Sequence, residues 1–256
     1  MTIIKAFVIL AKTIRYKIMT IILSSILATH YYDEEGIKCP QPLSDDNGIL
    51  TELTSRLTKH GRVVYVANDP FDTEHNDLSA PPVFKGLALS GLDFKEKILL
   101  DERNASEAAS IILEADLVIL SGGKILCQRD FFDRIKLGEI LKKYDGLVVG
   151  VSAGAMNLCK TIFNFPEETG DVGSPLWVDG LGFYDKIIIP HFDGETKSYQ
   201  LPCDEIDIVN DYIFPMSNGK TFIGIPNLSY ILIDKGNATI RGTAYSITDG
   251  KVKRIN

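Results

Sequence analysis

The stretch GLVVGVSAGAMN, residues 146–157, decides how the rest of the chain is interpreted. Residues 147–151 form a short apolar run that suits a strand buried in a parallel sheet. The run leads straight into Ser152, which is followed by Ala-Gly-Ala. Two interpretations fit these small residues: a tight turn in which nothing larger can pack, or a serine held at the mouth of a site so that its oxygen can attack a substrate.

Similar apolar runs alternate with segments of helical period along the chain. The predicted strands are residues 19–25, 62–67, 117–121, 147–151 and 186–190. The predicted helices are residues 48–60, 105–114 and 128–144. This alternation predicts an α/β fold, a three-layer, doubly wound, mostly parallel sheet with helices on both faces.

The last part of the chain, residues 221–256, has a different character. It contains the short runs TFIGI, SYILID, ATIRG and KVKRIN, separated by turn signals such as Asp249-Gly250. These runs predict an antiparallel edge or meander that closes the same domain. The sequence shows no internal repeat and no linker, so we expect a single domain over residues 19–256.

Residues 1–18 carry basic side chains in an apolar background. Their longest uncharged run, residues 6–11, is far too short to span a bilayer, and no convincing cleavage site follows it. We therefore expect neither stable membrane insertion nor a signal peptide. One alternative is a basic amphipathic helix that touches a membrane. We favour a short extension in front of a domain that opens at Met19.

The charge and the cysteines of the 256-residue chain limit its partners. A net charge of −7 at pH 7, with no Lys/Arg block, argues against nucleic acid as the main partner. The cysteines lie far apart, without CxxC spacing, so we expect reduced, mostly buried thiols in a cytoplasmic protein, and no zinc site or other cofactor. They are Cys39, Cys127, Cys159 and Cys203. A homodimer through an edge strand or a surface helix is ordinary at this size.

Three notable segments follow predicted strands: SGGK at residues 121–124, SAGA at 152–155 and PHFD at 190–193. In open parallel sheets, ligands bind beyond the carboxyl ends of the strands. We therefore expect the three segments to meet on one rim of the sheet.

The segment GVSAG, residues 150–154, fits the G-x-S-x-G elbow, a sharp turn between a strand and a helix that exposes the serine oxygen. Small neighbours are needed because the turn brings backbone close to backbone. The first N–H groups of the following helix would face the site, where they suit an oxyanion. The same pentapeptide also arises in ordinary tight turns, so the strand before it and the helix after it carry the catalytic interpretation.

A nucleophilic serine needs a base within hydrogen-bond distance. His191 is the histidine that follows a predicted core strand. His60 ends a predicted helix, a common structural place for a basic side chain, and His30 and His75 lie in polar sequence expected to form loops. The alternative for His191 is a partly buried residue that caps a strand. The charged residues after it favour the rim, and we favour the catalytic interpretation.

Gly122 and Gly123 are candidates for a second oxyanion donor, because adjacent glycines let backbone N–H groups approach a reacting carbonyl closely. A double glycine also occurs in loops without such a role. Lys124 beside them either binds a substrate carboxylate or is solvated. Arg129 is a second candidate for binding an acidic substrate, by its proximity in sequence alone.

Taken together, these motifs resemble those of the dipeptidase E / cyanophycinase family of serine peptidases. The resemblance runs over residues 19–256 and rests on LVILSGGK, GVSAGAMN, IIIPHFD, FIGIPNLSYILIDKGNATIRG and AYSITDGKVKRI. It implies a fold similar to that of class I glutamine amidotransferases, a flavodoxin-like sheet. It also implies Ser152 as the nucleophile, His191 as the general base, and an oxyanion hole made by the backbone N–H of Ala153 with that of Gly122 or Gly123.

Two positions depart from the family pattern. The family carries Asn after its glycines, where this chain has Lys124. The third triad member of the family is a carboxylate in a Leu-Pro-Glu-Gly type turn, and the matching turn here, IPNL, carries Asn227. An amide oxygen can accept from the histidine N–H, but it cannot stabilise an imidazolium as a carboxylate does. The comparable loss in a serine enzyme is roughly 10⁴ in turnover.

Three consequences of Asn227 stay open. In the first, the amide of Asn227 orients His191 and the enzyme turns over at a reduced rate. In the second, a nearby acid substitutes for the missing carboxylate. In the third, catalytic activity has been lost altogether. The candidate acids are Glu167, Asp193 and Glu195.

The leading functional hypothesis is a serine hydrolase of the dipeptidase E type that cleaves a small peptide through an acyl-enzyme on Ser152. A substrate with an N-terminal acidic residue is the specificity that the resemblance suggests. The alternative is a protein that binds a small molecule or peptide without chemistry, and Asn227 motivates it. A glutamine amidotransferase subunit is weakened because the elbow carries serine, and Cys159, about two helical turns further on, is expected in the core.

Overall fold

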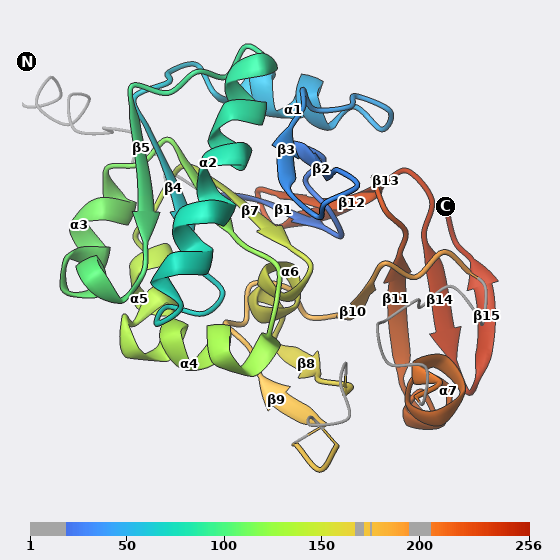
Figure 1. Ribbon diagram of the computed structural model, residues 1–256. Helices are drawn as coiled ribbons and strands as arrows, with labels where there is room; N and C mark the ends of the chain where they lie inside the picture. Colours follow the sequence, from blue (N-terminus) through green and yellow to red (C-terminus); the bar gives the residue numbers. More distant parts are fainter. Residues whose placement is uncertain (1–18, 167–171, 175, 195–205) are drawn as a thin grey trace, which may run out of the picture.

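The computed structural model describes residues 19–166, 172–174, 176–194 and 206–256, so the predicted extension 1–18 lies outside the described residues. The largest element is a seven-stranded sheet in the order β13-β12-β1-β7-β6-β4-β5 (Figure 1). Its strands are β1 (Thr20–Ser24), β4 (Arg62–Val66), β5 (Glu96–Leu100), β6 (Leu117–Leu120), β7 (Leu147–Val151), β12 (Tyr230–Asp234) and β13 (Asn237–Arg241). β1, β7, β6, β4 and β5 run parallel to their neighbours in that order. β12 and β13 add an antiparallel edge next to β1, as the sequence predicts.

Alternating side chains along the strands divide the core into two layers. Ile21 and Leu23 of β1 lie in one hydrophobic cluster, and Ile22 between them lies in the other. Helices α1 and α2 pack on the side of Ile22, and helices α3 to α6 pack on the opposite side. They are α1 (Ile49–Arg56), α2 (Thr73–Leu89), α3 (Ala108–Leu113), α4 (Ile125–Arg134), α5 (Leu137–Leu141) and α6 (Ala153–Leu158). The fold therefore has the three layers expected of a doubly wound sheet.

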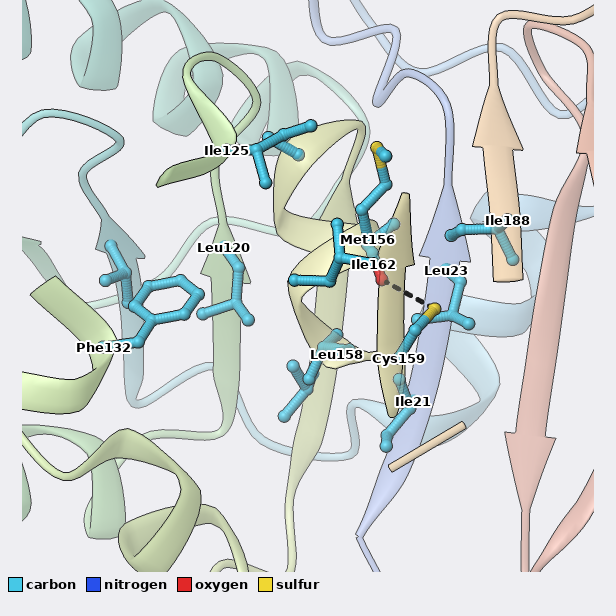
Figure 2. Close-up of a cluster of buried hydrophobic side chains, with 14 of the residues drawn as sticks. Ile21, Leu23, Leu120, Ile125, Phe132, Met156, Leu158, Cys159, Ile162 and Ile188 are labelled. Carbon is cyan, nitrogen blue, oxygen red and sulfur yellow. Dashed lines mark hydrogen bonds between the residues drawn. The ribbon is translucent and has the colours of Figure 1, made fainter. Parts of the chain in front are cut away.

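The layer that holds α6 forms the interior shown in Figure 2, where Met156, Leu158 and Cys159 pack against β1 and β10. Cys159 is buried, and its thiol donates to the carbonyl oxygen of Ala155 at 3.5 Å. Burial raises the pKa of the Cys159 thiol. The predicted place of Cys159 in the core is thus confirmed.

The expectation of mostly buried cysteines is wrong for the other two cysteines within the described residues. Cys39 and Cys127 are half-buried free thiols, because they lie on a peripheral hairpin and on the rim-facing part of α4. Cys203 lies outside the described residues.

Two helical segments are more broken than the sequence predicts. The single helix predicted over 128–144 is two helices, α4 and α5, separated at Lys136, whose φ of 56° is left-handed. The helix predicted over 105–114 begins as a 3₁₀ segment, η1 (Glu102–Glu107), and continues as α3. Helix α2 and strand β5 were not predicted. Pro81 and Pro82 lie inside α2. Because proline disfavours a helix interior, the sequence there does not predict a helix.

A second, four-stranded sheet in the order β10-β11-β14-β15 lies beside the main sheet (Figure 1). Its strands are β10 (Ile187–Pro190), β11 (Thr221–Ile225), β14 (Tyr245–Thr248) and β15 (Lys251–Arg254). The prediction that the strand at 186–190 belongs to the main parallel sheet is therefore wrong. β10 pairs with β11 instead, in parallel, whereas β11 pairs with β14 and β14 with β15 in the antiparallel arrangement predicted after residue 221. Pairing between distant strands is not encoded in local periodicity, so the sequence gives no signal for this choice.

Smaller elements surround the two sheets. Two hairpin-like pairs join β2 (His30–Tyr32) to β3 (Lys38–Pro40) and β8 (Thr161–Phe163) to β9 (Trp177–Asp179). A π-helical segment, η3 (Ile208–Ile213), continues into α7 (Phe214–Met216). Within the described part of the chain, no helix combines the length and apolar character needed to cross a membrane.

Candidate active site

The elbow at the end of β7 has the geometry that its small residues require. Ser152 has φ 49° and ψ −112°, and α6 begins at the next residue. A Cβ added to Gly154 would lie 2.3 Å from the carbonyl oxygen of Leu120, and one added to Gly150 would lie 2.8 Å from the backbone of Ala155. Packing thus demands glycine at both positions, and the same close turn leaves Ser152 lining a pocket. The two interpretations of this stretch are compatible.

His191 meets Ser152 from the second sheet. It follows β10 directly, has a left-handed φ of 61°, and places Nε2 at 2.9 Å from the hydroxyl oxygen of Ser152. Ser152 and His191 were expected at the same edge of one sheet, but the structure brings them together from two sheets. The separation of 2.9 Å lies within the range for a serine and its base.

Asn227 lies on the other side of the His191 ring, in the turn after β11. Its Oδ1 is 2.8 Å from Nδ1 of His191. Because an amide oxygen can only accept, Nδ1 carries the proton, and Nε2 is left with a lone pair facing the Ser152 hydroxyl. This assignment of the proton follows from the hydrogen bonds. Asn227 thus fixes the tautomer that a general base needs.

The surroundings of His191 favour its neutral form. Burial lowers the pKa of His191 below its ordinary value of 6.5, and the hydrogen bond that Nδ1–H donates to Asn227 opposes that shift in part. A lowered pKa keeps the imidazole unprotonated, and able to accept a proton, down to more acidic pH.

Of the acids considered as substitutes for the missing carboxylate, Asp193 is an exposed side chain two residues after His191. Glu167 and Glu195 lie outside the described residues. The group on Nδ1 of His191 is the amide of Asn227.

The glycines expected to form an oxyanion hole lie beside the serine. A Cβ on Gly122 would be 3.2 Å from the Cβ of Ser152, and both Gly122 and Gly123 line the same pocket. Gly123 has φ 135°, a conformation that favours glycine. Ala153 is buried at the first position of α6. The structure therefore brings Gly122, Gly123 and Ala153 around Ser152.

A buried polar network supports this loop from below. The side chain of Gln128, on α4, donates to the carbonyl oxygen of Ser121 at 2.8 Å. The amide of Asn157, on α6, donates to Oε1 of Gln128 at 3.1 Å. Both side chains are fully buried. They tie the glycine loop to the helix that follows Ser152, a role that sequence reasoning did not find.

The pocket over these groups has a volume of about 550 Å³, which is in the range of small-molecule sites. Its far wall is formed by the β2–β3 hairpin and α2, and contributes His30, Lys38 and His75. The amine of Lys38 donates to the carbonyl oxygen of Ser79 at 3.3 Å, and burial lowers the pKa of Lys38. Burial and the nearby charge of Lys38 lower the pKa of His30 to about 4.

The charged side chain that lines this pocket, Lys38, is basic, and no described acidic side chain lines it. None of the described residues that line it is an Asp or a Glu, so Lys38 is a cation without a carboxylate on the pocket wall. Sequence reasoning missed Lys38, and it assigned His30 and His75 to loops. His30 begins β2, and His75 lies in α2, where it shares a hydrogen bond with Ser79 at 3.0 Å. The turn at Gly36 between two short runs is the one local signal of the hairpin.

The two cations that the sequence suggested for substrate binding lie elsewhere. Lys124 is exposed at the start of α4, and it does not line the pocket. The guanidinium of Arg129 donates to the carbonyl oxygen of Asp179 at 2.7 Å and pairs with Asp133. Arg129 is also absent from the pocket wall. Lys38 takes the position that these residues were expected to have.

A search of the described residues finds no group of three or more His, Cys, Asp or Glu side chains placed to hold a metal ion. The groups that the site brings together are a serine, a histidine, an amide and the backbone around them.

The chain also matches known proteins in its sequence. A family model described as peptidase family S51 matches residues 53–241. The chain is 29% identical over 163 residues to Peptidase E from Citrobacter koseri, a match that covers 58% of this chain and 66% of that relative, just under two thirds of its length.

Two solved structures share the fold. The chain superposes on a peptidase from an acI-B1 actinobacterium with a TM-score of 0.60 at 16% identity, covering 93% of this chain and 94% of that one. A candidate Peptidase E protein from Listeria monocytogenes EGD-e gives a TM-score of 0.55 at 16% identity, with 87% and 98% covered.

Proposed function

The chain belongs to peptidase family S51, and from that premise we propose that it is a serine peptidase that cleaves small peptides through an acyl-enzyme on Ser152. The observation that carries the proposal is the contact of 2.9 Å between the Ser152 hydroxyl and Nε2 of His191. The orientation of His191 by Asn227 and the position of both groups on one pocket support it.

In the proposed reaction, the Ser152 hydroxyl attacks the carbonyl carbon of the scissile peptide bond while Nε2 of His191 takes the proton. The negative charge on the carbonyl oxygen is stabilised by the backbone N–H of Ala153 together with that of Gly122 or Gly123. The imidazolium then protonates the leaving amine. Water, activated by the same Nε2, attacks the ester and releases the acid product. Asn227 holds Nδ1–H throughout, so His191 keeps one orientation in both steps.

We further propose that the preferred peptide carries an acidic residue, with its carboxylate bound near Lys38. The pocket has a cation on its far wall and no described acidic side chain, which suits an anionic group. The volume of about 550 Å³ suits a dipeptide-sized ligand. A dipeptide panel tests this specificity: Asp-X should be cleaved faster than Leu-X and Gly-X, and equal rates would remove the proposed preference.

A fluorophosphonate probe read by intact mass tests the nucleophile. The folded protein should gain one adduct, mapped to Ser152 by peptide sequencing. Ser152→Ala and urea-unfolded protein should gain none, and His191→Ala should label far more slowly because the base is gone. Absence of an adduct on Ser152 in the folded protein would overturn the proposed function.

Asn227 favours one alternative, a protein that binds a small peptide in this pocket without turning it over. The amide lacks the charge that stabilises an imidazolium in the transition state. Measurable turnover of any dipeptide by the unmodified protein, abolished in Ser152→Ala, would remove this alternative.

A further inference from the structure

The groups of the candidate site come from two sheets, and the residues at the end of β1 bond to the backbone of both Ser152 and His191. The backbone N–H of Ser152 donates to the carbonyl oxygen of Ser24 at 2.8 Å. The backbone N–H of His191 donates to the hydroxyl oxygen of Ser25 at 3.0 Å. That hydroxyl in turn donates to the carbonyl oxygen of Ile225 at 2.6 Å.

The hydroxyl of Ser25 acts as donor in one of these bonds and as acceptor in the other. A serine hydroxyl has one proton and accepts through its lone pairs. Here the proton goes to Ile225, the last residue of β11, and a lone pair accepts from His191, which follows β10. Asn227 lies two residues beyond Ile225. One side chain therefore fixes the ends of both strands that present the His191–Asn227 pair.

The same segment holds the nucleophile. β1 pairs in parallel with β7, with Ser24 opposite Val151. This pairing fixes the position of the turn that carries Ser152. Ser25, the residue that follows β1, is itself fully buried. The separation between Ser152 and His191 thus depends on the backbone carbonyl of Ser24 and on the side chain of Ser25.

His191 needs such a support because its backbone is strained. Its φ of 61° is left-handed, and a non-glycine residue keeps that conformation only when its surroundings hold it. The N–H of His191 is anchored by Ser25, which fixes the backbone that directs the ring at Ser152.

We propose that Ser25 is a positioning residue that sets the distance between Ser152 and His191 by linking the second sheet to β1. The inference rests on the proposed function for its kinetic test. Its structural content, the fixed orientation of the His191 ring, can be measured without turnover.

The test compares Ser25→Ala with Ser217→Ala. Both serines are fully buried, and the Ser217 hydroxyl likewise donates to a backbone carbonyl, that of Phe214 at 2.7 Å, and accepts from a backbone N–H, that of Gly250 at 2.9 Å, but it does not line the pocket. Misplacing a catalytic group by about 1 Å can cost about 100-fold in rate. We expect kcat to fall about 10- to 100-fold in Ser25→Ala, with phosphonate labelling of Ser152 slowed in parallel, and to stay within about 2-fold in Ser217→Ala.

Two further variants separate positioning from packing. Ser25→Cys keeps the shape but replaces the hydroxyl with a weak hydrogen-bonding thiol, so it should fold and still lose rate. Ser25→Thr keeps the oxygen and should recover rate over Ser25→Ala. Equal kcat in Ser25→Ala, Ser25→Cys and the parent would overturn the inference.

A readout independent of activity is the ¹⁵N spectrum of the His191 side chain. The parent should show one fixed tautomer with the proton on Nδ1, and Ser25→Ala should show averaged nitrogen shifts while Ser217→Ala keeps the parent pattern. If the parent is not labelled by the phosphonate, the proposed function fails, and this spectrum still decides the role of Ser25. Unchanged nitrogen shifts in Ser25→Ala would reject it.

Discussion

Replacing Asn227 with Asp should strengthen the candidate site. The amide oxygen of Asn227 lies 2.8 Å from Nδ1 of His191, and Asp has the same shape, so the carboxylate can take the same place. The substitution adds a negative charge next to the imidazolium that forms when His191 accepts the serine proton. It leaves the hydrogen bond to neutral His191 intact.

The size of the gain follows from Coulomb's law. Two unit charges about 4 Å apart interact by ~1 kcal/mol in water and ~4 kcal/mol at the effective dielectric near a protein surface. Asn227 is exposed, so solvent screens the new charge, and we take about 1.4–2.8 kcal/mol from the lower part of that range. Since 1.36 kcal/mol is tenfold in rate, kcat should rise roughly 10- to 100-fold. The same interaction should raise the pKa of His191, because the new carboxylate favours its charged form.

The assay is the pH dependence of kcat and kcat/KM on a cleavable dipeptide. Because His191 must be neutral to act as a base, activity falls as pH falls through its pKa, and the acidic limb should move to higher pH in Asn227→Asp. Asn218→Asp is the matched control: it adds the same charge at an exposed asparagine before β11, at the opposite end of that strand from Asn227. A rate gain in both variants, or no gain and no shift of the acidic limb in Asn227→Asp, would refute the reasoning.

Three further predictions concern the site and its support. In the parent, the acidic limb of kcat/KM should lie below pH 6.5, because burial lowers the pKa of His191, and a limb above that value in a pH–rate profile would contradict this. Lys38→Met should raise KM for Asp-X dipeptides about 10-fold in steady-state assays, which is the low end of the effect of losing a charge-assisted hydrogen bond. KM for Leu-X dipeptides should stay within about 2-fold of the parent value. Gly154→Ala should destabilise the fold by about 2 kcal/mol or more in urea unfolding, since its Cβ would lie 2.3 Å from the Leu120 carbonyl oxygen. Gly138→Ala, with its nearest neighbour at 3.5 Å, should be nearly neutral.

The sequence predicts the elbow well because everything that forms it is local. A buried strand, glycines at 150 and 154, and a helix after Ser152 all lie within about a dozen residues. His191 could be chosen among the histidines because it follows an apolar strand directly. The contact between Ser152 and His191 was expected on that basis, and the structure has it.

What the sequence does not predict depends on contacts between distant segments. β10 pairs with β11 rather than with the main sheet, and nothing in residues 186–190 distinguishes the two choices. Lys38 lines the pocket because the β2–β3 hairpin packs against α2. The sequence does not predict α2 because this helix contains two prolines. Lys124 was preferred because it lies next to Gly123 in sequence. The side chain that faces the pocket is 86 positions before it.

The division of the site between two sheets has a consequence for the order in which structure and activity form in refolding and are lost in denaturant. Ser152 stands on the seven-stranded sheet, whereas His191 and Asn227 follow strands of the four-stranded one. Each sheet could complete its own hydrogen-bond ladder before the two dock, but neither would then hold a working pair. Hydrolysis should therefore be among the last properties gained in refolding and the first lost in mild denaturant, while circular dichroism still reports most of the helices.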